Sequence, residues 1–152
     1  MAVERPRPYS QFNFRVVIEN GPDADSMRAG FQEVSGLGLE ITVAEYRGGN
    51  FKDNTPMKVT GSYKNPDVTL KRGVIGDLET LYGWLDQVRS GSQTALRTVT
   101  IQLQSEDHAN TVQEWKLTNA RPTKYTGPAL TGKGTDVAIE ELVLAYERLD
   151  LQ

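Results

Sequence analysis

Histidine is the side chain best suited to acid–base chemistry near neutral pH, and this sequence contains one, His108. Ser105 and Asp107 lie within three residues of it, so the residue types of a nucleophilic triad are present. Triad members normally converge from separate elements of a fold, whereas these three share one turn. The pattern therefore predicts a solvated turn histidine and not a catalytic base.

Metal and phosphate sites have equally little support. One histidine and no cysteine exclude the usual zinc ligand sets, and no disulfide can form. Gly36 and Gly38 lack the third glycine and the helix of a dinucleotide site, and residues 132–135 lack the spacing of a phosphate-binding loop. The acidic pairs at 106–107 and 140–141 are expected to be solvated. We expect no catalytic, cofactor-binding or metal-ligating residue, and no enzymatic activity.

Composition predicts one ordinary soluble domain over residues 1–152. The net charge of −3, from 17 basic and 20 acidic residues, gives no basic footprint for specific nucleic-acid binding. No apolar run is long enough to cross a bilayer, and the N-terminus shows no signal peptide. Residues 1–9, with two prolines, are expected to form a flexible arm, and the chain is expected to fold in the cytoplasm.

The strongest helix signal covers residues 77–90. Asp77 is a predicted N-cap, and Gly91 lies where a left-handed residue commonly closes a helix. Apolar side chains recur on one face at helical spacing, so Tyr82 and Trp84 are predicted to be core residues.

Period-two alternation predicts strands in most of the remaining chain. The predicted strands are residues 11–19, 29–34, 39–46, 58–63, 68–71, 97–105 and 111–119. Residues 47–57 are predicted to form a long exposed loop, and 121–134 to be rich in loops. Residues 136–148 fit a helix or a strand, and their β-branched residues favour the strand. The expected fold class is mainly β, a sandwich or small barrel with one helix packed against its side.

Several predicted strands have one polar face, whose residues should contact water and still favour extended structure. In the third strand Leu39, Ile41 and Val43 are expected on one face. Unpaired edges of this kind pair readily with another chain, so a repeated subunit could use them to enclose a water-filled bore.

The ordered set of motifs resembles the inner-tube (tail tube) protein family of contractile phage tails and phage-tail-like contractile injection systems. The resemblance covers residues 11–150 and rests on these segments: Phe12 to Ile18, Phe31 to Leu37, Glu45 to Gly49, Leu70 to Val74, Trp84, and Asn119 to Tyr125. It implies a β-sandwich or barrel whose copies form hexameric rings, stacked into a rigid hollow tube inside a contractile sheath. Implied partners are the chain itself, the sheath protein, baseplate or hub and terminator proteins, and cargo or DNA in the lumen. Assembly in the cytoplasm as part of a virion or injection particle is implied, with no cofactor.

The resemblance also suggests roles for particular residues. The candidate inter-ring contact loop comprises Arg47, Gly48, Gly49, Asn50, Phe51 and Met57. Lys71 and Arg72 are placed at a subunit boundary, with Asp77, Glu79 or the next subunit as partners. The predicted lumen-facing residues are Glu40, Thr42, Glu45, Lys58, Thr60 and Ser62, with Thr100, Gln102, Glu114 and Lys116 as further candidates.

Two other functions stay open from the sequence. One is a hub or cap protein that links such a tube to a spike or terminator, which the short undecorated chain disfavours. The other is a secreted β-sandwich binding module or small hydrolase, which would need a deep pocket containing His108 and two carboxylates.

Overall fold

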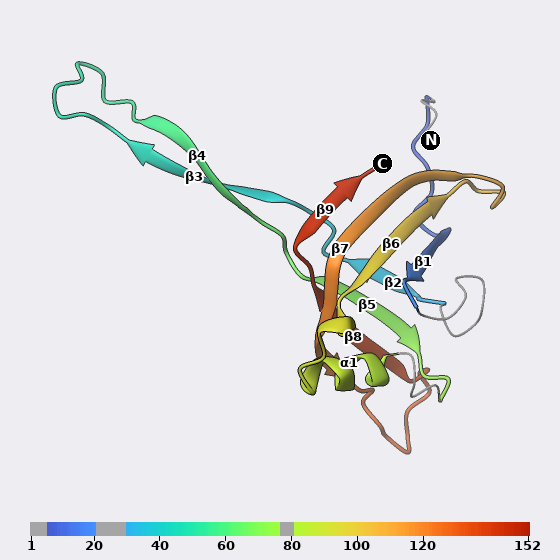
Figure 1. The fold of residues 1–152 in the computed structure, drawn as a ribbon. Helices are drawn as coiled ribbons and strands as arrows, with labels where there is room; N and C mark the ends of the chain where they lie inside the picture. Colours follow the sequence, from blue (N-terminus) through green and yellow to red (C-terminus); the bar gives the residue numbers. More distant parts are fainter. Residues whose placement is uncertain (1–5, 21–29, 77–80) are drawn as a thin grey trace.

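The computed structural model describes residues 6–20, 30–76 and 81–152, and within them the chain is mainly β (Figure 1). The elements run in the order β1 (Phe14–Ile18), β2 (Glu33–Ser35), β3 (Glu40–Tyr46), β4 (Met57–Lys64), β5 (Val68–Gly73), α1 (Tyr82–Arg89), the short 3-10 helix η2 (Gln93–Ala95), β6 (Arg97–Gln104), β7 (Thr111–Thr126), β8 (Ile139–Ala145) and β9 (Arg148–Leu151). The predicted fold class, mainly β with one side helix, is confirmed.

The body of the molecule is a seven-stranded antiparallel sheet folded over one core. Its strand order is β1-β6-β7-β8-β5-β2, with β9 paired to β7. The 16-residue strand β7 pairs with β6 and β9 through its first half and with β8 through its second. Because β7 curves, the two halves of the sheet form two layers (Figure 1).

Alternation along these strands supplies the core between the layers. Val16 lies opposite Ile101, and Leu70 lies opposite Leu142, with all four side chains buried. Each fully buried aliphatic side chain of this size contributes about 1.5–3 kcal/mol. Trp84 of α1 is buried beside them, and its indole Nε1 donates to the Ala95 carbonyl at 2.6 Å.

The helix is shorter than predicted within the described residues, beginning at Tyr82 and ending at Arg89. The predicted cap Asp77, and Glu79, lie outside the described residues. Gly91 has φ +80°, so the left-handed helix end is confirmed. The burial of Trp84 is confirmed, but the prediction for Tyr82 is wrong because its side chain is 44% exposed. Its ring packs edge-on against Tyr125, with centroids 6.3 Å apart, at the margin of the core.

Two expectations about the second half of the chain need correction or completion. Residues 121–126 are not loop but the end of β7, and Pro122 fits there because the pairing with β8 shifts between Pro122 and Lys124. A proline is tolerated at such an irregularity, because no backbone N–H is needed there to pair the two strands. The segment 136–148 is not a helix: it forms β8 and leads into β9.

Candidate assembly surface

Strands β3 and β4 form a separate two-stranded sheet, here called the ribbon, which projects far from the body (Figure 1). Every residue of both strands is exposed. An isolated two-stranded hairpin is marginally stable in water, because it has no core to cover its apolar residues. The ribbon is therefore the part of the described chain that most needs a partner.

The pairing of β3 with β4 shifts between Ile41 and Val43, where Gly61 and Ser62 of β4 lie opposite the single residue Thr42 of β3. The β-bulge is therefore in β4, and it reverses the alternation along that strand. Strand β3 gains no residue, so Ile41 and Val43 share a face, as predicted, and Val43 lies opposite Thr60. Gly61 marks the irregularity, since a Cβ there would lie 3.1 Å from the Thr42 carbonyl oxygen.

Opposite charges pair across the two strands of the ribbon. Glu40 lies opposite Lys64, and Glu45 lies opposite Lys58, so each carboxylate faces an ammonium across the strands. Because Glu40 and Glu45 are five residues apart in β3, the two pairs lie on opposite faces of the ribbon. Thr60 shares the face of Glu45 and Lys58, whereas Thr42 shares the face of Glu40, so the predicted lumen residues are divided between the two faces.

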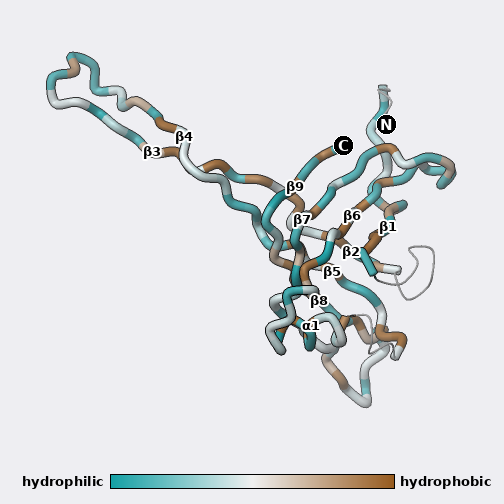
Figure 2. The backbone as a smooth tube through the Cα atoms, in the orientation of Figure 1, coloured by the Kyte–Doolittle hydropathy of each residue, from teal (hydrophilic) through white to brown (hydrophobic). Residues whose placement is uncertain are grey.

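Apolar residues occur along both strands of the ribbon (Figure 2). The register places Ala44 opposite Val59 and Tyr46 opposite Met57 on one face toward the tip, and Ile41 opposite Tyr63 on the other face near the base. The large apolar side chains of these pairs are each 52–59% exposed: Ile41, Tyr46, Met57, Val59 and Tyr63. A soluble monomer rarely exposes apolar side chains gathered in this way unless another molecule binds them.

The tip of the ribbon, residues 47–56, folds back on itself. Arg47 donates to the carbonyl oxygens of Phe51 and Asp53, both at 3.1 Å, and the Phe51 ring packs edge-on against Tyr46. Gly48 is buried, and a Cβ there would lie 2.9 Å from the Phe51 ring. The glycine thus makes room for a side chain of its own loop, whereas Gly49 and Asn50 are exposed.

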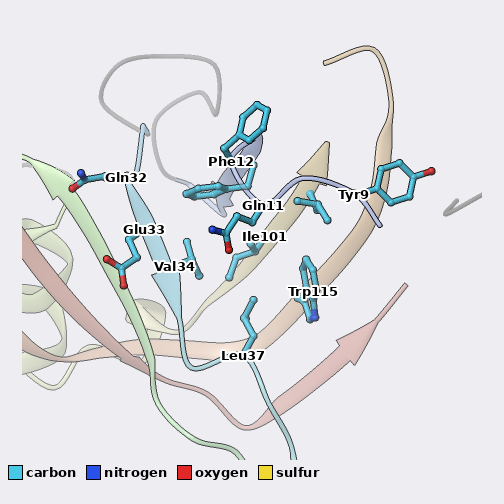
Figure 3. A pocket seen from close by; sticks show the side chains of 11 residues that line it. Tyr9, Gln11, Phe12, Gln32, Glu33, Val34, Leu37, Ile101 and Trp115 are labelled. Carbon is cyan, nitrogen blue, oxygen red and sulfur yellow. The ribbon is translucent and has the colours of Figure 1, made fainter. Parts of the chain in front are cut away.

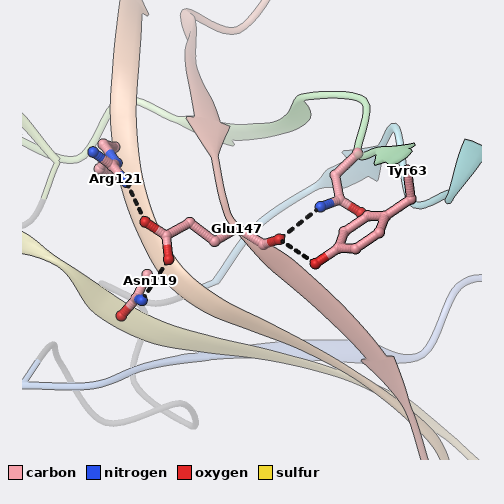
Figure 4. A network of polar contacts seen from close by, with 5 residues as sticks. Tyr63, Asn119, Arg121 and Glu147 are labelled. Atoms are coloured by element: carbon pink, nitrogen blue, oxygen red, sulfur yellow. Dashed lines mark hydrogen bonds and ion pairs between the residues drawn. The ribbon is translucent and has the colours of Figure 1, made fainter. Parts of the chain in front are cut away.

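The base of the ribbon is held by Glu147, between β8 and β9 (Figure 4). Its backbone carbonyl accepts from the Asn65 side-chain amide at 3.0 Å and from the Tyr63 hydroxyl at 3.5 Å. Its carboxylate accepts from Asn119 at 2.8 Å and from Arg121 at 3.1 Å. One residue thus ties the ribbon to β7 and sets the direction in which it leaves the body.

Of the two predicted boundary cations, only Lys71 is accessible. Its ammonium lies 3.8 Å from the Glu33 carboxylate. Arg72 is 1% exposed, and its Nε donates to Glu140 at 2.6 Å. Alternation along β5 puts Arg72 on the core side with Val68 and Leu70. The partners expected for it, Asp77 and Glu79, lie outside the described residues.

Tyr125 completes the buried pair from β7. Its hydroxyl donates to the second Glu140 oxygen at 2.8 Å. That hydrogen bond to the carboxylate, with burial, raises the pKa of Tyr125. The Glu140 carboxylate is thus bonded on both oxygens, as a buried charge requires.

The outer face of the β1-β6-β7 layer is a second polar surface. Arg15 of β1 donates to Gln102 of β6, which donates to Glu114 of β7 at 2.6 Å. Thr100 lies opposite Lys116 in the same ladder. The four further lumen candidates therefore share one side of one layer.

A groove opens between β1 and β2, the outermost strands of the body's strand order (Figure 3). Its volume is about 630 Å³, and β6 and β7 form its floor with Ile101, Leu103 and Trp115. Sequence reasoning missed this groove because its walls come from segments far apart in the chain: Tyr9, Gln11, Phe12, Phe14, Gln32, Glu33, Val34 and Leu37.

His108 lies in the exposed β6–β7 turn at φ +60°. Its Nδ1 is 3.2 Å from the Gln104 side-chain oxygen, while Asp107 accepts from the Ser105 hydroxyl and the Ala109 amide. The Ser105 hydroxyl, followed by that backbone amide, holds the pKa of Asp107 below its ordinary value. The three residues form a hydrogen-bonded turn and no triad, as predicted.

Within residues 6–20, 30–76 and 81–152, no three His, Cys, Asp or Glu side chains cluster as metal ligands would. No helix in the same described residues is long and apolar enough to span a membrane.

Comparison with known proteins identifies the family. Residues 10–150 match the family described as T4-like virus tail tube protein gp19. No curated protein sequence matches the chain significantly.

Several solved structures share the fold. A chain of the sheath-tube complex of PVC, an extracellular contractile injection system, is 27% identical, with a TM-score of 0.81 over 97% of this chain and 93% of that one. A chain of the PVC sheath/tube terminator is 28% identical, with a TM-score of 0.80 over 99% of both chains. A chain of the anti-feeding prophage tube-terminating cap, at 24% identity, shares the fold, with a TM-score of 0.83 over 100% of this chain and 95% of that one. With the family match covering nearly the whole chain, this protein belongs to the tail tube family of contractile phage tails and contractile injection systems.

Proposed function

We propose that the chain is the repeating subunit of a hollow inner tube, in which six copies form a ring and rings stack inside a contractile sheath. The observation that carries this proposal is the ribbon, whose large apolar side chains are not covered by the body. Because one copy's ribbon meets a different surface on the next copy, the contact is head-to-tail and can close into a ring. Sheath, baseplate and terminator proteins are the proposed further partners, as the similar solved structures suggest.

In this arrangement the ribbon face that carries Glu45, Lys58 and Thr60 lines the lumen, with the outer face of the β1-β6-β7 layer as a second candidate lining. Glu45 faces Lys58 across the strands, so this lining is balanced in charge. A balanced wall lets cargo of either sign slide without sticking.

Cysteine labelling of assembled tubes tests the lumen assignment, since the native chain has no cysteine. We expect Thr60→Cys to react with a small hydrophilic maleimide in intact tubes and Val59→Cys to be protected. Both variants should react equally as dilute subunits, because both residues are exposed there. Protection of Thr60→Cys with free reaction of Val59→Cys would overturn the assignment.

The exposed part of the ribbon tip, with Gly49 and Asn50, is the proposed contact with the adjacent ring, and Lys71 the proposed boundary cation. Deleting residues 48–54 should leave a folded subunit that forms rings but no stacks in negative-stain micrographs. Long tubes from the deletion variant would contradict this role of the tip.

A terminator or cap role is the second candidate, because the terminator structure resembles this chain as closely as the tube structure does. Purified protein that forms single rings and never polymerises would favour that role. Either role is structural, and we propose that the chain is not an enzyme, in keeping with its family.

A further inference from the structure

A row of side chains crosses the layer formed by β2, β5, β8 and the second half of β7, and two of its members are buried charges. Arg72 of β5 and Glu140 of β8 lie directly opposite each other, at 1% and 7% exposure. The Tyr125 hydroxyl of β7 reaches the same carboxylate, and the Phe31 ring, just before β2, lies 6.0 Å from the Arg72 guanidinium. The row therefore contacts three strands of the layer and the segment that leads into the fourth.

Stability alone does not explain a buried ion pair in this row. Taking two charges out of water costs about as much free energy as their mutual attraction supplies, so apolar residues of similar size would serve a core equally well. Separating the two charges inside the core is strongly unfavourable, however, because each then remains buried without its partner. A buried pair consequently selects the one arrangement that keeps its members together.

The other core-facing residues of β5 and β8 do not select an arrangement. They are all aliphatic and buried: Val68 and Leu70 in β5, and Leu142 and Leu144 in β8. If β5 slid along β8 by two residues, every side chain would keep its face, and aliphatic residues would again lie opposite one another. A slide in either direction would, however, take Arg72 away from Glu140.

We propose that the Arg72–Glu140 pair is a register lock, which selects one alignment of β5 with β8, and that Tyr125 extends the lock to β7. The pairing of β7 with β8 shifts between Pro122 and Lys124, so the strand beyond the shift needs its own alignment contact. The hydrogen bond from Tyr125 to Glu140 supplies that contact at 2.8 Å.

The neighbouring pair of opposite charges cannot act in the same way. Lys71 lies opposite Glu141 on the outer face of the layer, where both side chains are partly exposed. Water solvates such charges when they separate, so an exposed pair has little influence on the alignment.

The lock also determines where the ribbon leaves the body. Strand β4 runs into β5 at the base of the ribbon, and Asn65 between them donates to the Glu147 carbonyl beyond β8 at 3.0 Å (Figure 1). A slide by two residues would move β5 by about 6.8 Å along β8 and break that hydrogen bond. This consequence for assembly rests on the proposed function, whereas the register lock itself does not.

Disulfide trapping measures the register directly, since the native chain has no cysteine. Thr69 lies opposite Val143 on the outer face, so Thr69→Cys with Val143→Cys reports the native alignment. Replacing the second cysteine by Glu141→Cys or Ala145→Cys reports a slide by two residues in one direction or the other. Directly opposite residues meet the Cα separation of a disulfide, whereas diagonal neighbours, about 7–8 Å apart, do not.

Each reporter would be refolded in glutathione buffer, in the parent and in a variant without the lock. That variant combines Arg72→Met, Glu140→Leu and Tyr125→Phe, which fill the same space and leave no buried charge. In the parent, the slide reporters should form at least about 100-fold less disulfide than the native reporter. Without the lock they should rise at least about tenfold, while circular dichroism and the urea midpoint show a fold as stable as the parent's.

The matched control is Lys71→Gln, which removes a charge from the same strand on the outer face and should leave the parent pattern unchanged. Negative-stain microscopy of the variant without the lock, in the absence of cysteines, should show far fewer tubes than the parent forms at the same concentration.

The outcomes separate this inference from the proposed function. A variant that keeps only the native register, or that loses its fold, would overturn the register lock. A slid register together with normal tubes would overturn its consequence for the ribbon. Parent protein that never forms tubes would overturn the proposed function, while the trapping result would still decide the register lock.

Discussion

The body and the ribbon are both built from antiparallel strands, but the body buries one face of its strands and the ribbon leaves both faces exposed. In the body, β5 and β8 alternate buried and partly exposed residues, and one face of each is lost to the core. In the ribbon, β3 and β4 also carry apolar residues between polar ones, yet no residue is buried. Alternation therefore fixes which residues share a face, but not whether the chain itself covers that face.

The comparison predicts that equivalent aromatic truncations have very different costs. Trp84→Ala in the body should lower the free energy of unfolding by about 3–5 kcal/mol, because it leaves a cavity and orphans the Ala95 carbonyl. Tyr46→Ala in the ribbon should change the unfolding of a dilute subunit by only about 0.5 kcal/mol. Urea denaturation measures both, and similar costs would mean that the ribbon is part of the subunit's core.

The junction between the two regions should be sensitive at one glycine. Gly36 has φ +90°, and a Cβ there would lie 2.2 Å from the Asp67 backbone oxygen, where β2 passes the start of β5. Gly36→Ala should cost more than about 3 kcal/mol, or prevent folding, because neither backbone can move aside freely.

Gly91→Ala is the matched control, since φ is +80° there but nothing lies within 4 Å of the added Cβ. It should cost about 1 kcal/mol through backbone strain alone. Equal melting temperatures for the two variants would contradict the close approach at Gly36.

Loosening the base of the ribbon should have a smaller effect on the subunit and a larger one on assembly. Asn65→Ala removes the 3.0 Å hydrogen bond to the Glu147 carbonyl and should cost about 1 kcal/mol in unfolding. Because the ribbon then loses part of its fixed direction, ring formation followed by light scattering should slow markedly. Unchanged assembly would show that the ribbon finds its partner without this anchor.

The smallest predicted effect is the pH dependence of the β6–β7 turn. The folded-state pKa of Asp107 is lowered, so its contribution to stability is present above its ordinary value of 3.8 and is lost as pH falls through the folded value. Asp107→Asn should therefore be slightly less stable than the parent at pH 6. The difference should shrink toward pH 3 in thermal melts, and a difference that grew on acidification would contradict the assigned hydrogen bonds.

Much of the fold was predictable because alternation and turn residues act locally. The strands 97–105 and 111–119 were expected, and β6 and β7 form the hairpin. Arg72 was predicted at a subunit boundary because charged side chains usually lie on the surface. It follows Leu70 by two residues in β5, however, and this spacing indicates the core side. The bulge in β4 was missed as well, although Gly61, an isolated glycine within that strand, was its available signal.

The groove and the base of the ribbon could not be predicted in the same way. Phe12, Leu37 and Trp115 meet only after the sheet has folded, and no local pattern records that contact. The same holds for Asn65 and Glu147, which are 82 residues apart in sequence.

Hydrogen–deuterium exchange of the dilute subunit and of assembled tubes is the most direct test of the claim that copies of the chain complete the ribbon. We predict that amides of β5 and β8 are protected in both states. Amides of β3 and β4 should exchange quickly in the subunit and become protected in the tube. A ribbon that is equally protected in the two states, or equally unprotected, would contradict the account.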